Sequence, residues 1–197
     1  MTLTPEQSKE LARILRGGLE KCAKRLEDVT HAGWAVERVA VAPGGEITPA
    51  SLPDELPLEH FGTFLATAGA SFLMMFPPRS GYLVTNAFTR DVPDKIEKMS
   101  ERDSKALAET SNIVVNALLA HLAEASGRRL LISAPEMLVD RKRGLFFRAL
   151  GRLRDSKKLA ATVFASLSSR DLLESECDIV VFLDDDLAGR LLHLLRG

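Results

Sequence analysis

The stretch from Ala106 to Met137, ALAETSNIVVNALLAHLAEASGRRLLISAPEM, decides how this chain folds. At about 100° per residue, one face of a helix here carries Leu107, Val114, Leu118, Leu122 and Ala125. Glu109, Asn112 and Asn116 fall together on the opposite side. Asparagine is a weaker helix former than lysine, glutamate or alanine, which a surface chosen for stability alone would favour. The two asparagines therefore weaken the simplest interpretation, a solvated helix face, without excluding it.

Signals on either side of this stretch set the limits of the helix. We expect it to run from about Ser100 to Ser126 and to end at Gly127, because a left-handed glycine commonly closes a helix. A strand over residues 128–140 should follow it. Upstream, the apolar residues 61–76 predict a strand, or a pair of strands broken near Gly69.

The beginning of the chain shows a similar order of elements. Thr4-Pro5-Glu6-Gln7 predicts a helix start with a capping box, and an apolar stripe from Leu11 to Val29 continues the helix to about Gly33. Residues 34–42 then predict a strand, and residues 43–57, rich in proline and glycine, predict a loop. A long helix followed by a strand thus occurs twice, which indicates a duplicated unit.

The remaining elements complete an α/β protein. Residues 140–144 are basic and predict a turn. The other predicted elements are a short helix at 81–90, a helix at 145–155, strands at 159–169 and 177–184, and a terminal helix at 185–196.

Composition bounds the class of protein. The chain has 197 residues, 46% of them hydrophobic, which is enough for one substantial core. Lysine plus arginine (26) nearly balances aspartate plus glutamate (27), so no overall field favours nucleic acid or a membrane as partner. Cys22 and Cys177 show no metal spacing and predict two buried free thiols. Without a signal-peptide pattern or an apolar run approaching about 20 residues, the protein is expected to be cytoplasmic.

One spacing ties the polar helix face to the residues beyond the helix. Glu109-x-x-Asn112 is followed by 22 intervening residues and then Pro135. This signature resembles that of the CheC/CheX/FliY family of chemotaxis phosphatases. The resemblance extends more loosely over most of the chain, including residues 70–91 and 177–195.

The resemblance implies a fold and a reaction. The fold would be an α+β, pseudo-duplicated CheC-like domain over residues 1–197, with a mostly antiparallel sheet and two long helices on one face. Its N-terminal half would cover about 1–60 and its motif-bearing half about 61–197. Members of the family hydrolyse the aspartyl phosphate of a response-regulator receiver domain such as CheY. Asn112 would orient the attacking water and Glu109 would pair with the receiver's lysine. The protein would need no cofactor of its own, since the receiver supplies Mg²⁺.

Two departures from the family pattern keep an alternative open. The position four residues before Glu109, commonly aspartate or serine in the family, is Lys105. The first helix carries Glu10-x-x-Arg13 without the asparagine, so the first half looks degenerate. The alternative is a non-catalytic CheC-like scaffold, in a flagellar switch or with the deamidase CheD, and a third is an unrelated small-molecule-binding domain. Asn116 and Lys105 are expected to line the docking surface.

Other polar clusters have simpler explanations. Asp184–Asp186 at a predicted helix start are typical of N-capping and of the helix dipole rather than of a metal site. The four histidines show no metal-ligand spacing. The basic residues 141–143 and 152–158 are interpreted as solvated, with contact to an acidic receiver surface as the alternative. Gly17-Gly18 lacks the pattern of a phosphate loop and indicates a kink or close helix packing.

Overall fold

The computed structural model describes residues 3–44, 58–90, 99–153 and 159–193. Within these ranges the chain forms helices and strands in the order expected from its sequence. They are α1 (Pro5–Thr30), β1 (Ala35–Pro43), β2 (Glu59–Thr67), β3 (Ala70–Phe76), α2 (Pro78–Thr89), α3 (Glu101–Ser126), β4 (Glu136–Arg141), α4 (Lys142–Leu153), β5 (Leu159–Ser169), β6 (Ser175–Asp184) and α5 (Asp185–His193). The predicted loop at 43–57 lies almost entirely outside the described residues.

The strands form one six-stranded antiparallel sheet. Its order is β1-β5-β6-β3-β2-β4. Exchanging β1 with β4, β2 with β5 and β3 with β6 gives the same order read from the other edge. Each strand after α1 thus has a counterpart after α3, as a duplicated unit requires. The single domain with halves at 1–60 and 61–197 stays a prediction, and the sheet order favours a division after β3.

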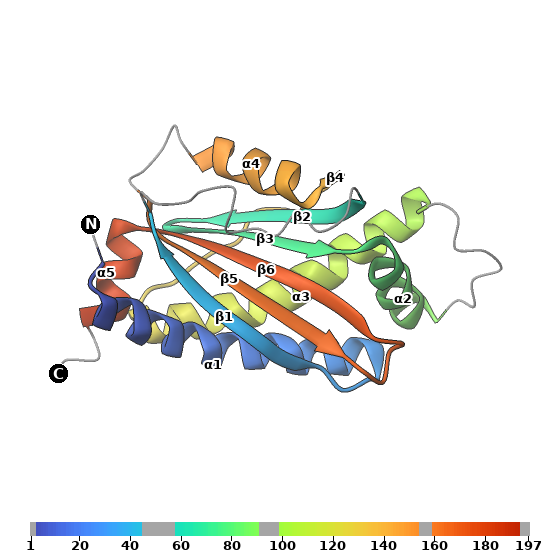
Figure 1. The fold of residues 1–197 in the computed structure, drawn as a ribbon, viewed down its shortest axis with the longest axis horizontal. Coiled ribbons are helices and arrows are strands. Elements are labelled where there is room, and N and C mark those ends of the chain that lie inside the picture. Colours follow the sequence, from blue (N-terminus) through green and yellow to red (C-terminus); the bar gives the residue numbers. More distant parts are fainter. Residues whose placement is uncertain (1–2, 45–57, 91–98, 154–158, 194–197) are drawn as a thin grey trace.

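Helices cover the two faces of the sheet unequally. The two long helices α1 and α3 lie side by side on one face, and α4 lies on the other (Figure 1). The larger core joins α1, α3 and α5 to the sheet, whereas a smaller core lies beneath α4. In the smaller core the ring of Phe146 packs against Phe164 and Phe182, with centroids 5.7 and 5.6 Å apart. The predicted α+β class, with two long helices on one face, is confirmed.

Capping fixes both long helices. Thr4 accepts a hydrogen bond from the backbone N–H of Gln7, whose side chain accepts one from the Thr4 backbone, as predicted. Ser100 and Asp103 form the same reciprocal pair at the start of α3. Gly127 closes α3 with φ 63°, also as predicted. The apolar stripes alone define where each helix packs, and the caps define where it begins.

One glycine, Gly18, lets α1 and α3 cross closely. A Cβ at Gly18 would lie 2.5 Å from Leu118 Cδ1 and 2.9 Å from His121 Cδ2. His121 Nε2 donates a hydrogen bond to the carbonyl of Ile14, 2.8 Å away, because a carbonyl oxygen can only accept. Close packing, one of the two roles that the sequence indicated for the Gly17-Gly18 pair, is therefore the role of Gly18. This crossing holds α3 at a fixed depth on the sheet.

Two sequence predictions need correction. The strand expected over residues 128–140 begins only at Glu136, because the segment before it makes no regular ladder. In that segment only Ser133 bonds to β2. Its backbone N–H donates to the carbonyl of Ala66 at 2.8 Å, and its side-chain Oγ accepts from the Ala66 N–H at 3.0 Å. The basic turn at 140–144 is also wrong, since β4 ends at Arg141 and α4 begins at Lys142.

Among the helices that the structure describes, one is long and apolar enough to cross a membrane by composition alone. It is α3, whose most apolar window has a mean hydropathy of 1.2 and is 56% buried inside the fold. The core helix of a globular domain passes the same test, and here the apolar side of α3 packs on α1 and the sheet.

Candidate functional site

The residues singled out in the sequence lie on the outer face of α3. Lys105, Glu109 and Asn116 are exposed and Asn112 is half-buried, whereas Leu107, Val114 and Leu118 on the opposite side are fully buried. Lys105, Glu109, Asn112 and Asn116 follow one another at spacings of three or four residues, so they form a continuous stripe along the helix. We call these four residues the motif face. The structure brings together every site residue that the sequence predicted.

Glu109 presents an unpaired carboxylate on this face. Lys105, one turn earlier, could reach it, but its ammonium instead pairs with Glu101 Oε1 at 2.7 Å. Among the described residues, the Glu109 carboxylate has no hydrogen bond or ion pair. A free carboxylate on a helix surface keeps its full capacity to bind an incoming cation.

Asn112 and Asn116 are joined by hydrogen bonds. Asn116 Nδ2 donates to the backbone carbonyl of Asn112 at 2.8 Å and to Asn112 Oδ1 at 3.0 Å. Asn112 Nδ2 has no partner among the described residues. The carboxamide of Asn112 is therefore held at its oxygen end and open at its nitrogen end.

An apolar side chain that the sequence reasoning missed lies beside the motif face. Ile113 is 37% exposed, four residues after Glu109 and three before Asn116. A β-branched residue at the edge of a polar helix face costs helix propensity. Its spacing from Glu109 was the signal available in the sequence.

Pro135 lies in the segment that connects α3 to β4. It directly precedes Glu136, the first residue of β4. Pro135 falls within the strand expected over residues 128–140, whereas the structure places it just before the strand begins. The spacing between Asn112 and Pro135 thus covers the part of α3 after Asn112 plus the connection to β4.

The first long helix offers no second copy of the motif. Helices α1 and α3 both contain 26 residues. Glu109 and Asn112 are the ninth and twelfth residues of α3, and the same places in α1 hold Arg13 and Arg16. Arg13 is occupied by Glu10, with Arg13 Nη2 2.6 Å from Glu10 Oε1. The first half therefore lacks both the glutamate and the asparagine at the equivalent positions.

Comparison with known proteins adds the fold. No protein-family model and no curated protein matches the sequence. Solved structures do resemble it: Thermotoga maritima FliY has a TM-score of 0.68 at 14% identity, covering 97% of this chain and 96% of FliY. CheX from Desulfovibrio desulfuricans has a TM-score of 0.58 at 12% identity, covering 87% of this chain and 99% of CheX. The chain has the CheC/CheX/FliY fold.

The same fold occurs in FliM. The middle domain of Helicobacter pylori FliM has a TM-score of 0.59 at 10% identity, covering 96% of this chain and 98% of that domain. FliM has also been solved in complex with FliG and with SpeE. The CheC/CheX/FliY fold alone therefore leaves the choice between catalysis and scaffolding to the residues of the motif face.

The other polar clusters of this CheC-like fold are engaged in structure. Asp184 Oδ1 accepts the N–H of Leu187 at 2.8 Å and caps α5, and Asp186 pairs with Arg190 at 3.1 Å. The contact of Asp184 confirms the N-capping interpretation, whereas that of Asp186 is an ion pair within α5. Among the basic residues, Lys142 pairs with Asp178 at 2.5 Å and Arg152 with Glu136, so these two are not simply solvated. Residues 154–158 lie outside the described part.

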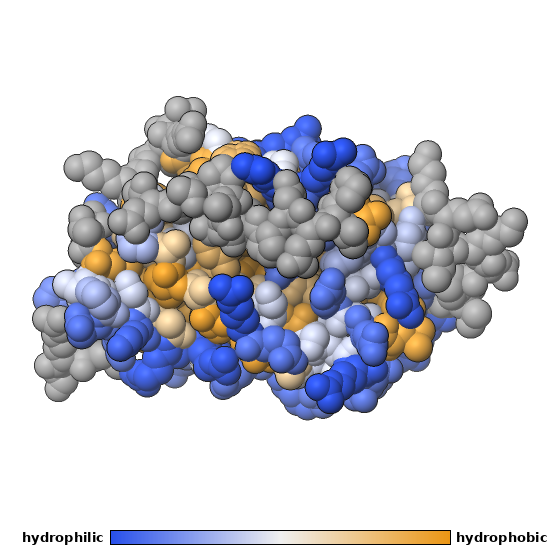
Figure 2. Space-filling view, viewed as in Figure 1, coloured by the Kyte–Doolittle hydropathy of each residue, from blue (hydrophilic) through white to orange (hydrophobic). Residues whose placement is uncertain are grey.

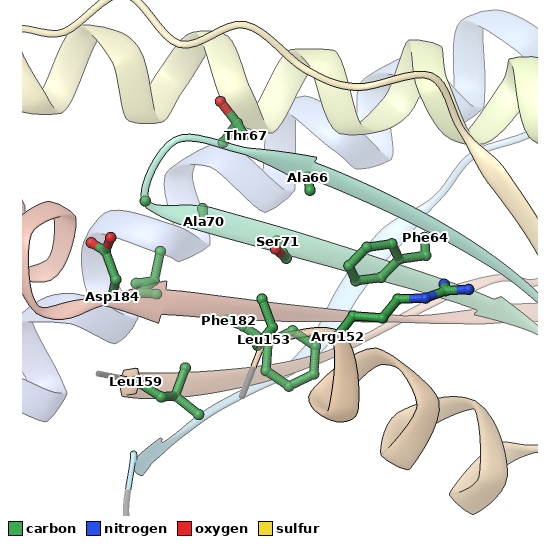
Figure 3. Close-up of a pocket in the computed structure, with 12 residues that line it drawn as sticks. Phe64, Ala66, Thr67, Ala70, Ser71, Arg152, Leu153, Leu159, Phe182 and Asp184 are labelled. Carbon is green, nitrogen blue, oxygen red and sulfur yellow. The ribbon is translucent and has the colours of Figure 1, made fainter. Parts of the chain in front are cut away.

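A cavity of about 190 Å³ lies on the α4 side of the sheet, the side opposite the motif face. Figure 3 shows Arg152 of α4 reaching toward Phe64, and the guanidinium carbon stands 5.1 Å from the centre of that ring. Asp184, at the other end of the cavity, is the cap of α5. In the space-filling view, apolar residues show between the hydrophilic ones over the sheet (Figure 2). Both charged groups of the cavity are committed to contacts that stabilise the fold.

Neither cysteines nor acidic clusters supply a reactive centre. Burial raises the pKa of the Cys22 thiol to about 12, and burial raises the pKa of Cys177 well above its usual value. Both thiols are buried and free, as predicted. Within residues 3–44, 58–90, 99–153 and 159–193, no three histidine, cysteine, aspartate or glutamate side chains gather where they could hold a metal ion.

Proposed function

We propose that this protein is an aspartyl-phosphate phosphatase that acts on the receiver domain of a response regulator such as CheY, in chemotaxis or another two-component pathway. The observation that carries the proposal is the motif face, where an unpaired Glu109 carboxylate and the open end of the Asn112 carboxamide lie one turn apart. The fold shared with CheX and FliY supports it.

Asn112 orients the attacking water in this proposal. The water oxygen forms a bond to phosphorus while the bond from phosphorus to the aspartyl oxygen breaks. The aspartyl carboxylate leaves with the bonding electrons, and the proton of the water passes to phosphate and solvent. A neutral carboxamide can accept from the water and donate to a phosphoryl oxygen without adding negative charge, whereas a carboxylate would be repelled.

Glu109 sets the register of docking. A receiver holds a lysine and Mg²⁺ at its phosphorylated aspartate, so the partner already supplies the positive charge that phosphoryl transfer needs. The free carboxylate of Glu109 is suited to pair with that lysine, since Lys105 is already engaged by Glu101. Loss of Glu109 should therefore weaken docking and rate together. This chain needs no cofactor of its own for these steps.

Ile113 provides an apolar contact beside the polar pair. Ile113 is 37% exposed beside Glu109 and Asn116, so a receiver docked on the motif face would cover its side chain. Apolar side chains surrounded by polar groups commonly anchor transient interfaces, because their burial on docking releases water. Asn116 and Lys105 would line the same docking surface.

A non-catalytic scaffold is the second candidate. The likeness to the FliM middle domain favours it, because that protein has been solved in complex with FliG. The arginines at the equivalent positions of α1 agree with a fold that has lost one site. A flagellar-switch protein or a CheD-like deamidase would then be the partner, and the location would be cytoplasmic in either case.

Phosphate release from a panel of phosphorylated receiver domains with Mg²⁺ separates the two candidates. Wild type, Glu109→Ala and Asn112→Ala are compared with Glu124→Ala, an exposed glutamate on the same helix about 22 Å from Glu109. Acceleration by wild type and Glu124→Ala, but not by the other two variants, is the expected result. Binding of a receiver without acceleration would favour the scaffold, and acceleration that survives in Asn112→Ala would refute the assigned role.

A further inference from the structure

We propose that Asn116 is a positioning residue, which determines which end of the Asn112 carboxamide faces the phosphoryl group. The inference rests on the proposed function, because it gives that site a third member. Asn116 does not touch the reacting atoms; it acts through Asn112.

The hydrogen bonds on the motif face leave only one orientation for each amide. The backbone carbonyl of Asn112 can only accept, so the group of Asn116 that lies 2.8 Å from it must be the amide nitrogen. That same nitrogen lies 3.0 Å from the side chain of Asn112, which must therefore offer its oxygen. If Asn112 were turned around, two NH₂ groups would face each other. A backbone atom thus fixes Asn116, and Asn116 fixes Asn112.

The consequence is a donor aimed outward. With Oδ1 held by Asn116, the NH₂ group of Asn112 is the end left for a phosphoryl oxygen, and the second lone pair of Oδ1 stays available for the attacking water. A hydrogen bond received at the oxygen also strengthens the donor end of the same amide. An asparagine on a helix without such a partner could present either end and would lose rate whenever the oxygen faced the phosphate.

Helix stability does not account for this arrangement. On the same helix, the hydroxyl groups of Ser111 and Thr110 donate hydrogen bonds to backbone carbonyls one turn earlier. The acceptors are Leu107, at 2.8 Å, and Ala106, at 2.9 Å. A serine at position 116 could donate its one hydroxyl hydrogen to the Asn112 carbonyl in the same manner, but it would have no second donor for Asn112 Oδ1. The substitution Asn116→Ser therefore keeps the backbone bond and removes only the bond that orients Asn112. Asn116→Asp replaces the donor by an acceptor, which would attract the NH₂ group of Asn112 and reverse its amide.

The side-chain NH₂ resonances of Asn112 test the orientation without any partner. In ¹⁵N-labelled protein, we expect Asn116→Asp to shift these resonances and to slow their exchange with water severalfold, because the carboxylate accepts from Asn112 Nδ2. Asn116→Ser should leave them exchanging at least as fast as in wild type. Identical shifts and exchange rates in wild type and Asn116→Asp would overturn the proposal, whether or not the protein proves to be a phosphatase.

Kinetics with a phosphorylated receiver test the consequence for the reaction. Asn116→Ser should lower kcat roughly 10-fold while the Kd for the receiver changes less than about 3-fold. Asn116→Asp should lower kcat about 100-fold, as removal of a transition-state donor does. A wild-type kcat in Asn116→Ser, or a loss confined to KM, would contradict a positioning role. If wild type itself fails to accelerate hydrolysis, the proposed function falls and the NMR result decides the orientation alone.

Discussion

Replacing Gly18 by alanine tests the packing that holds α3 in place. The new Cβ would lie 2.5 Å from Leu118 Cδ1, which is about 1 Å inside an ordinary carbon contact. Leu118 is fully buried, so its side chain cannot move into solvent, and overpacking of this kind costs about 1–3 kcal/mol. Alanine also gains about 1 kcal/mol of helix propensity over glycine. The net effect of Gly18→Ala is a loss of up to about 2 kcal/mol.

The neighbouring glycine is a matched control. A Cβ at Gly17 would meet nothing closer than 3.4 Å, at His121 Cε1, so Gly17→Ala gains helix propensity without a clash. The two variants share the propensity term, and their free energies of unfolding should differ by about 1–3 kcal/mol. Urea titrations give this difference from the midpoints when the slope m is unchanged. Equal stabilisation by both substitutions would refute the close crossing of α1 and α3.

Three further predictions concern other parts of the chain. Neither Cys22 nor Cys177 should react with a disulfide reagent at pH 8 in the folded protein, because burial raises the pKa of Cys22 to about 12 and that of Cys177 well above normal. Both thiols should react in urea, and rapid labelling of the native protein would contradict their burial. Gly127→Ala should lose about 1 kcal/mol of stability, because φ is 63° at that residue. Gly189→Ala, in open space on α5, should lose none, and equal melting temperatures of the two variants would contradict the prediction. Lys105→Ala should change the free energy of unfolding by less than about 0.5 kcal/mol, because its pair with Glu101 is exposed, and a larger loss in chemical denaturation would show a contact beyond that pair.

Helix ends and alternating strands could be predicted from sequence because their signals are local. The capping box at Thr4, the glycine after Ser126 and the break at Gly69 each fix a boundary through the backbone geometry of a few residues. The strand expected over 128–140 failed for the opposite reason. Its residues are apolar enough for a strand, but they lie at the edge of the sheet, where only Ser133 finds β2 before Glu136. Sequence patterning does not show which neighbour a segment meets.

The candidate site, too, could be predicted from the sequence only in part. Helix periodicity alone is enough to place Glu109, Asn112 and Asn116 on one face. It does not show that Lys105 turns to Glu101 and leaves Glu109 free, because both glutamates are four residues from Lys105. Nor does it show the bonds from Asn116 to Asn112, which depend on the rotamers of both side chains. Those contacts leave the Glu109 carboxylate free and determine which end of the Asn112 amide is open.

The rate of aspartyl-phosphate hydrolysis on a receiver domain, with and without Asn112, tests the central claim most directly. In a time course with Mg²⁺, wild-type protein should accelerate the loss of phosphate in proportion to its concentration. Asn112→Ala should lose about 100-fold of that acceleration while still binding the receiver. Equal acceleration by wild type and Asn112→Ala, or none by wild type on any receiver that it binds, would contradict the account.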